Sequence, residues 1–230
     1  MLAAFFWLLF AYVLGSFPTA YVAGRWLKGV DIRRYGSGNV GGANVWEMVA
    51  RWAIVPVALM DVGKGALAVY GARWLNLGPE TQTAAGLAAI CGHNWSLFLG
   101  FSGGRGISVL LGALLLLAPR EMAVVALALV VGKAVRNVSL VCGLGVLALP
   151  IVALTLREPA FVVWGCLGIT IIVFAKRLLS NHPGTGIAGK DWKEVLRNRL
   201  LFDRDIQDKG AWIHRLASEQ AENEMMETET

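Results

Sequence analysis

Long apolar segments follow one another along most of this 230-residue chain, and they constrain its fold more than any other feature. A bilayer has a hydrocarbon core about 30 Å thick, which a helix of about 20 residues can cross. Charged residues make up 16% of the chain, against roughly 25% in soluble domains. A soluble chain of this size cannot bury the apolar side chains of all these segments in its core. We therefore exclude a soluble enzyme and expect an all-α integral membrane protein.

Seven apolar segments are candidates for transmembrane helices. The fourth is short for a crossing, and Pro119 directly follows it. A single broken span across the fourth and fifth segments would give six crossings, whereas a tight turn at Pro119 gives seven. The segments are expected at residues 2–23, 52–75, 81–99, 107–118, 122–135, 138–156 and 160–175.

Basic residues decide between these two topologies, because cytoplasmic loops carry an excess of Lys and Arg. With seven spans and an outer N-terminus, only Arg73, Arg120 and Arg157 of the 21 basic residues fall outside, and Lys64 falls within a span. With six spans, the basic C-terminal region would lie outside. We therefore predict seven spans, an outer N-terminus and a cytoplasmic C-terminus.

The composition changes after the last apolar segment, which divides the chain into a membrane domain, residues 1–180, and a cytoplasmic tail, residues 181–230. Apolar residues recur at helical spacing from Trp192 to Leu200, with basic residues between them. This pattern predicts an amphipathic helix on the inner membrane surface. From Glu219 the tail is polar and acidic, and we expect that end to be disordered. We expect the tail to be solvated and to take no part in catalysis.

Glycine is the second unusual feature, with 27 residues where an average of roughly 7% would give far fewer. One cluster lies between the first two segments and reads Tyr35-Gly36-Ser37-Gly38-Asn39-Val40-Gly41-Gly42-Ala43-Asn44. Its spacing contains GxGxxG, but membrane spans flank it in place of a βαβ unit, so we exclude a dinucleotide site. Consecutive glycines let backbone N–H groups converge on an anion. The cluster predicts an anion-binding loop, with a flexible turn as the alternative.

A second cluster, Gly-Gly-Arg-Gly at residues 103–106, precedes the fourth segment. Exposed backbone, a helix N-terminus and a guanidinium group together suit phosphate oxygens. No Lys-Ser/Thr pair follows, so a nucleotide-binding P-loop is excluded. His93, in the third segment, is either a packing residue or a catalytic one. It has no second ligand at metal-binding spacing, and the three cysteines form no metal pattern, so we expect neither metal nor cofactor.

Asp61 and Lys64 lie within the second apolar segment. Charges at this depth are costly, and they usually pair with each other or line a polar cavity. Residues three apart share one face of a helix. The spacing therefore predicts either a buried ion pair or a polar site within the membrane.

In order and spacing, these strings resemble the bacterial acyl-phosphate:glycerol-3-phosphate acyltransferase family (PlsY). The resemblance covers roughly residues 1–180. It implies a seven-helix enzyme of the bacterial inner membrane with Gly-rich phosphate-binding loops on its cytoplasmic face. Such an enzyme transfers a fatty acyl group from acyl phosphate to the 1-hydroxyl of glycerol 3-phosphate in phospholipid synthesis, giving 1-acyl-glycerol 3-phosphate and phosphate. The partners implied are these substrates and membrane lipids, and not nucleic acid.

The resemblance also implies roles for individual residues. Catalytic roles fall to Ser37, Asn39, His93 and Arg105, with Arg105 standing where the family usually has Lys. Substrate-binding roles fall to a larger set: Gly36, Gly38, Gly41, Asn44, Asp61, Lys64, Asn94, Gly103, Gly104, Arg136 and Ser139.

One departure from the family pattern concerns the last segment, where a functional His and Asn are replaced by Ile171 and Phe174. The site would lose a polar wall, unless Asn181 and His182 compensate from further along the chain. Two alternatives therefore stay open. One is a noncatalytic or regulatory relative that binds phosphorylated lipids, and the other is a transporter of phosphate esters, suggested by Asp61 and its neighbouring lysine.

Overall fold

The structure is a computed structural model that describes residues 1–179 and 191–214. These residues are helical throughout, apart from turns and one isolated antiparallel bridge between Ser96 and Ser102. The α-helices are α1 (Leu2–Ser16), α2 (Thr19–Lys28), α3 (Gly42–Met48), α4 (Ile54–Trp74), α5 (Pro79–Asn94), α6 (Ile107–Leu117), α7 (Pro119–Ala134), α8 (Val138–Thr155), α9 (Ala160–Leu179) and α10 (Trp192–Phe202). Short 3₁₀ turns occupy Ile32–Arg34, Arg51–Ala53 and Leu97–Leu99. The prediction of an all-α protein is confirmed.

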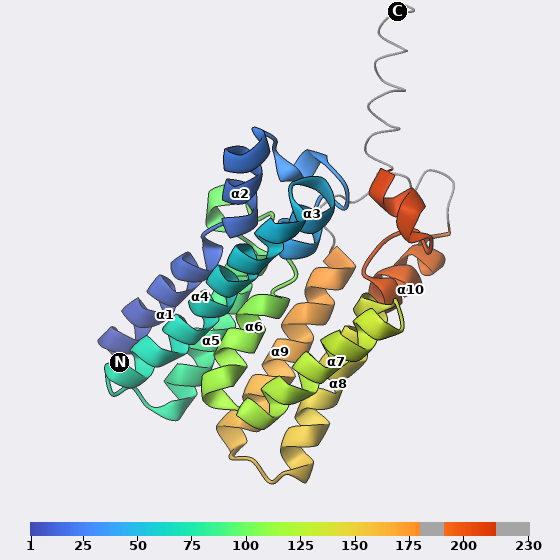
Figure 1. The fold of residues 1–230 in the computed structure, drawn as a ribbon. Helices are drawn as coiled ribbons and strands as arrows, with labels where there is room; N and C mark the ends of the chain where they lie inside the picture. The colour runs from blue at the N-terminus through green and yellow to red at the C-terminus, as the bar shows by residue number, and fades with distance from the viewer. Residues whose placement is uncertain (180–190, 215–230) are drawn as a thin grey trace, which may run out of the picture.

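Four helical stretches among the described residues are long and apolar enough to cross a membrane: residues 2–28, residues 51–74, α8 and α9. The other helices of the bundle are shorter, with 16 residues in α5, 11 in α6 and 16 in α7. The chain reverses direction between α6 and α7 (Figure 1), and Pro119 is the first residue of α7. The fourth and fifth predicted segments are thus two helices, as expected for a tight turn.

The first apolar segment differs from the prediction of one helix through residue 23. Helix α1 ends at Ser16, and α2 begins at Thr19. The break lies at Phe17 and Pro18, because proline has no N–H to continue the helix and disfavours the helical conformation of the residue before it. Phe17 accordingly has an extended ψ of 120°.

Glycines bring the helices of the bundle into close contact. Helix α1 packs on α5, and α4 packs on α6. A Cβ atom on Gly15 would clash with the backbone of Ala89, and one on Gly112 would clash with the backbone of Val62. Small residues at such crossings let two helix backbones approach, which is a main source of packing energy between membrane helices. Part of the glycine excess is therefore explained by packing alone.

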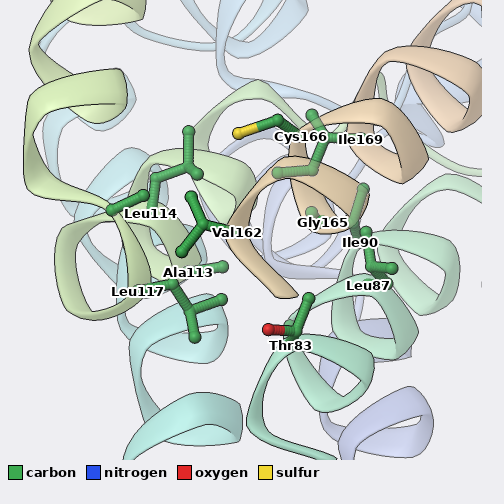
Figure 2. Close-up of a pocket in the computed structure, with 12 residues that line it drawn as sticks. Thr83, Leu87, Ile90, Ala113, Leu114, Leu117, Val162, Gly165, Cys166 and Ile169 are labelled. Carbon is green, nitrogen blue, oxygen red and sulfur yellow. The ribbon is translucent and has the colours of Figure 1, made fainter. Parts of the chain in front are cut away.

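The two ends of the bundle differ (Figure 1). Helices α2, α3 and α10 lie at one end, which we call the α3 end, and the loops that follow α4, α6 and α8 lie at the other. In the half away from α3, a cavity of about 10 Å³ lies between α5, α6 and α9. Figure 2 shows aliphatic side chains such as Leu117, Val162 and Ile169 around it. The lining is apolar apart from Thr83, whose hydroxyl donates to the carbonyl of Pro79, so this small space offers too few polar partners for a water molecule.

A helix, α10, lies where the C-terminal helix was predicted, but its surroundings were not predicted, and its place on the membrane surface stays a prediction. Val195, Asn198 and Arg199 are buried, and α10 packs against α8 and α9. Arg199 donates a 2.7 Å hydrogen bond from Nη1 to the carbonyl of Leu178 at the end of α9. The expectation of a solvated tail is wrong for this segment, since basic side chains are stabilised by the unpaired carbonyls at a helix C-terminus.

Two expectations fall on residues that lie outside the described part of the chain. These are the possible compensation by Asn181 and His182, and the predicted disorder from Glu219 to the end.

Candidate functional site

A cavity of about 270 Å³ opens at the α3 end of the bundle. Residues from both Gly-rich loops line it, together with residues from α4, α8, α9 and the turn after α10. Segments far apart in the sequence thus meet at one space. Eight of the predicted site residues line the cavity: Ser37, Asn39, Gly41, Asn44, Asp61, His93, Arg105 and Ser139.

Asn44 organises the first Gly-rich loop. Its Oδ1 accepts a 3.1 Å hydrogen bond from the backbone N–H of Ser37, while its Nδ2 donates to the carbonyls of Tyr35 (3.0 Å) and Asn39 (3.2 Å). Gly36 has a φ of +59°, and a Cβ there would clash with Asn44 Oδ1. The amide of Asn44 is therefore already engaged in holding the loop closed. Its predicted contact with substrate stays a prediction.

The second Gly-rich loop packs against His93. The N–H of Gly104 donates to the carbonyl of His93 at 3.1 Å, and the N–H of Val40 donates to the carbonyl of Gly103 at 3.5 Å. A Cβ on Gly104 would clash with His93 Nε2 and with the carbonyl oxygen of Val40. Glycine is required here because the two loops and the imidazole ring meet without room for a side chain. Helix α3, with seven residues, follows the first loop directly.

Asp61 and Lys64 form the predicted ion pair, with Lys64 Nζ 2.7 Å from Asp61 Oδ1. Thr19 donates its hydroxyl to the same carboxylate, and Lys64 also donates to the carbonyl of Phe17. His93 Nδ1 lies 3.7 Å from Asp61 Oδ1. Both charges are buried and used within the protein, as the cost of isolated charges requires. The pair joins α4 to the break between α1 and α2, and only its carboxylate faces the cavity.

Arg105 meets a partner that sequence reasoning missed. Its Nε lies 2.9 Å from Oδ2 and 2.8 Å from Oδ1 of Asp203, the residue that ends α10. Its Nη1 donates a 3.0 Å hydrogen bond to the carbonyl of Lys176 on α9. A guanidinium group has five N–H donors. The hydrogen bonds to Asp203 and Lys176 use two of them, and Arg105 is one of the residues that line the cavity.

Arg177 is a second cation of the cavity that was not predicted as a site residue. It donates from Nη1 to the carbonyl of Leu200 at 2.9 Å and from Nη2 to the carbonyl of Ser139 at 2.8 Å. Carbonyl groups orient a guanidinium without neutralising it, so its positive charge remains. The Lys176-Arg177 pair at the end of the last apolar segment was the available signal, but it was interpreted only as a topology marker.

Several predicted residues do not line the cavity. Arg136 is exposed, and in the last helix Val173 and Arg177 line the cavity while Ile171 and Phe174 do not. Ile171 is 59% exposed on the outside of α9, so its replacement of a polar residue removes nothing from this space. The predicted residues that stand behind the lining are Gly36, Gly38, Lys64, Asn94, Gly103 and Gly104.

The remaining wall of the cavity is apolar. Ile54 and Ala58 of α4, Leu129 of α7 and Val138 of α8 contribute to it. Among the described residues, no group of three or more His, Cys, Asp or Glu side chains is placed to hold a metal ion. A lining that combines two guanidinium groups and both Gly-rich loops with aliphatic side chains suits a ligand with an anionic head and an apolar chain.

Known proteins are similar in sequence to this chain over most of their length. A profile of the family described as "Glycerol-3-phosphate acyltransferase" matches residues 5–182. "Glycerol-3-phosphate acyltransferase 4" of Dehalococcoides mccartyi is 37% identical over 211 residues, covering 89% of this chain and 90% of that protein. "Glycerol-3-phosphate acyltransferase" of Synechococcus sp. is 43% identical over 156 residues, covering 67% of this chain and 78% of that protein.

The fold is also found in solved structures. The crystal structure of PlsY, an integral membrane glycerol 3-phosphate acyltransferase, in its glycerol 3-phosphate form has a TM-score of 0.70 and 30% identity, covering 76% of this chain and 88% of that chain. Its lysophosphatidic acid form has a TM-score of 0.68. The sequence matches and the shared fold point to the same family, and the meeting of both Gly-rich loops at one cavity is consistent with it. The chain is therefore an integral membrane protein that belongs to the glycerol-3-phosphate acyltransferase family.

Proposed function

We propose that the protein transfers a fatty acyl group from acyl phosphate to the 1-hydroxyl of glycerol 3-phosphate, releasing 1-acyl-glycerol 3-phosphate and inorganic phosphate. The observation that carries this proposal is the cavity at the α3 end, where Arg105, Arg177 and both Gly-rich loops face an apolar wall. Each substrate carries a phosphate group, and one also carries an acyl chain. Both features find complementary surfaces in the cavity.

The reaction needs positioning more than covalent chemistry, because acyl phosphate is a mixed anhydride and is already activated. The 1-hydroxyl oxygen attacks the acyl carbon, the bond from that carbon to the phosphate oxygen breaks, and phosphate leaves with the electron pair. Arg105 and backbone N–H groups of the loops stabilise the negative charge that grows on the phosphate. We assign the role of accepting the hydroxyl proton to His93, which lines the cavity beside Asp61. Ser37 and Asn39 bind phosphate or hydroxyl oxygens.

The proposed topology follows from the same arrangement. Seven crossings place α2, α3, α10 and the cavity at the cytoplasmic face of the bacterial inner membrane, with the N-terminus outside. The shorter helices α5, α6 and α7 complete the bundle beside longer neighbours, and α7 keeps an exposed apolar face that includes Leu127 and Val130. The excess of basic residues at the α3 end supports this orientation.

The test is phosphate release by membranes that contain the protein. Release is expected from acyl phosphate only when glycerol 3-phosphate is present, and acyl-CoA is not expected to replace acyl phosphate. Arg105→Ala should lower the rate by about 100-fold or more, since removing one group that stabilises transition-state charge costs about that much. Release no greater than from membranes without the protein would refute the proposal.

A further inference from the structure

Asp203 lies beyond the residues that match the family profile, yet it forms part of the cavity wall. Its carboxylate contacts Arg105 at the Nε edge, and the two side chains are only 16% and 13% exposed. We propose that Asp203 is a positioning residue, which holds the Arg105 guanidinium in the orientation that binds the substrate phosphate. This inference rests on the proposed function, since it deepens the account of the same site.

The backbone around Asp203 is fixed by contacts to the bundle. Before it in the chain, Arg177 of α9 donates to the carbonyl of Leu200. After it, Asp205 accepts a 2.5 Å hydrogen bond from Arg199, which also donates to α9. Arg177, Arg199 and Asp205 are all buried. The backbone that carries the Asp203 carboxylate is therefore held in place on both sides by contacts that do not involve Arg105.

The identity of residue 105 explains why a positioning partner is needed. The resemblance described above has Lys at this position, and an ammonium group is a compact charge whose three donors rotate freely. A guanidinium group is a planar fork, so its donors reach a phosphate only when the plane is turned correctly. Asp203 on Nε and the carbonyl of Lys176 on Nη1 fix that plane from two different elements.

The direction in which removal of the Asp203 carboxylate changes the affinity for the substrate phosphate distinguishes a positioning role from simple charge repulsion. A carboxylate beside a phosphate site weakens anion binding by charge repulsion alone, so its removal would then strengthen binding. Positioning predicts the opposite, namely weaker binding when the carboxylate is removed. Arg177 also keeps the cavity positive while Asp203 is present, because its hydrogen bonds to described residues go to carbonyl groups.

The experiment compares Asp203→Ala and Asp203→Asn in the full chain, each in the wild-type background and in the Arg105→Lys background. Turnover gives kcat/KM, and calorimetry in detergent gives the affinity for glycerol 3-phosphate. In the wild-type background, Asp203→Ala should lower both quantities about tenfold or more, because a buried hydrogen bond to a charged group is lost. Asp203→Asn keeps an acceptor for the Nε–H and should stay within about threefold of wild type. In the Arg105→Lys background, Asp203→Ala should change either quantity by less than about threefold.

Asp208→Ala is the matched control, because this carboxylate belongs to the same segment, is exposed and does not line the cavity. The inference is overturned if Asp203→Ala strengthens binding or turnover, or lowers them equally in the two backgrounds. If wild type binds glycerol 3-phosphate without turnover, the proposed function fails, and the binding measurements still decide the role of Asp203. If wild type turns over and Asp203→Ala leaves both quantities unchanged, the inference alone fails. If wild type neither binds nor reacts, both are refuted.

Discussion

The polar cavity at the α3 end and the apolar cavity between α5, α6 and α9 are built from the same helices in different ways. The polar cavity has a volume of about 270 Å³, against about 10 Å³ for the apolar one. Both Gly-rich loops and the turn after α10 reach the polar cavity, whereas only helix faces and their ends surround the apolar one (Figure 2). Regular helices pack densely against one another and leave little space between them. A space large enough for a substrate therefore needs irregular backbone, and the N–H and C=O groups of that backbone need hydrogen-bond partners outside a helix.

The largest effect is expected from disturbing the contact between the two Gly-rich loops. Gly104→Ala places a methyl group against His93 and the carbonyl of Val40, so the loop must move. A shift of about 1 Å at a reacting centre can cost about 100-fold, and we expect at least that loss in kcat/KM. Gly63→Ala is the control, since a Cβ there meets nothing within 4 Å in helix α4. Similar turnover by the two variants would show that the loops adapt to a side chain.

A smaller effect, on stability and not on activity, is expected at the apolar cavity. Ile169→Val removes one methyl group from the lining contributed by α9 and so enlarges a mostly apolar space. The free energy of unfolding should fall by about 0.5–1.5 kcal/mol, with kcat/KM within about twofold of wild type. Thermal unfolding in detergent and the turnover assay measure the two quantities. A large loss of activity would mean that the two cavities are coupled through the bundle.

The smallest effect concerns an ion pair at the polar end, in which Asp31 is buried and Arg33 is partly exposed. Arg33 lies 2.7 Å from Asp31, and its hydrogen bonds to that carboxyl lower the pKa of Asp31 below its ordinary value. A lowered pKa stabilises the folded state at pH above the ordinary value near 3.9, and this contribution is lost as the pH falls through the folded-state pKa. Asp31→Asn should therefore lower the thermal midpoint at pH 7, by the equivalent of about 1 kcal/mol or less, and this difference should shrink toward about pH 3.

The measurement for this pair is the difference in thermal midpoint between wild type and Asp31→Asn across that pH range. A difference that stays constant down to about pH 3 would show that Asp31 acts through packing and not through its charge.

Local sequence signals predicted most of the membrane domain. Hydropathy located the long helices, and Pro119 separated α6 from α7 because proline favours the first turn of a helix. Spacing predicted the ion pair of Asp61 and Lys64, since residues three apart share a helix face. The first span was predicted as continuous, and the effect of Pro18 was missed, because hydropathy does not register a missing N–H.

The candidate site was predictable where its residues cluster in the sequence. Both Gly-rich loops are local motifs, and eight residues named from the sequence line the cavity. Residues that act through distant contacts were not predictable. Asn44 was expected to touch substrate and is seen to hold its own loop, Arg136 is exposed, and positions 171 and 174 do not face the cavity.

By itself, the sequence determined that this is a helical membrane protein with two Gly-rich motifs, because apolar periodicity, charge bias and glycine spacing are local properties. Only the tertiary structure decided which groups share one cavity. The hydrogen bond between Arg105 and Asp203 joins residues 98 positions apart. Arg105 precedes an apolar helix, and Asp203 belongs to a tail that its composition predicts to be solvated. Such a contact depends on how helices pack and where their ends meet, and a linear pattern contains no record of that geometry.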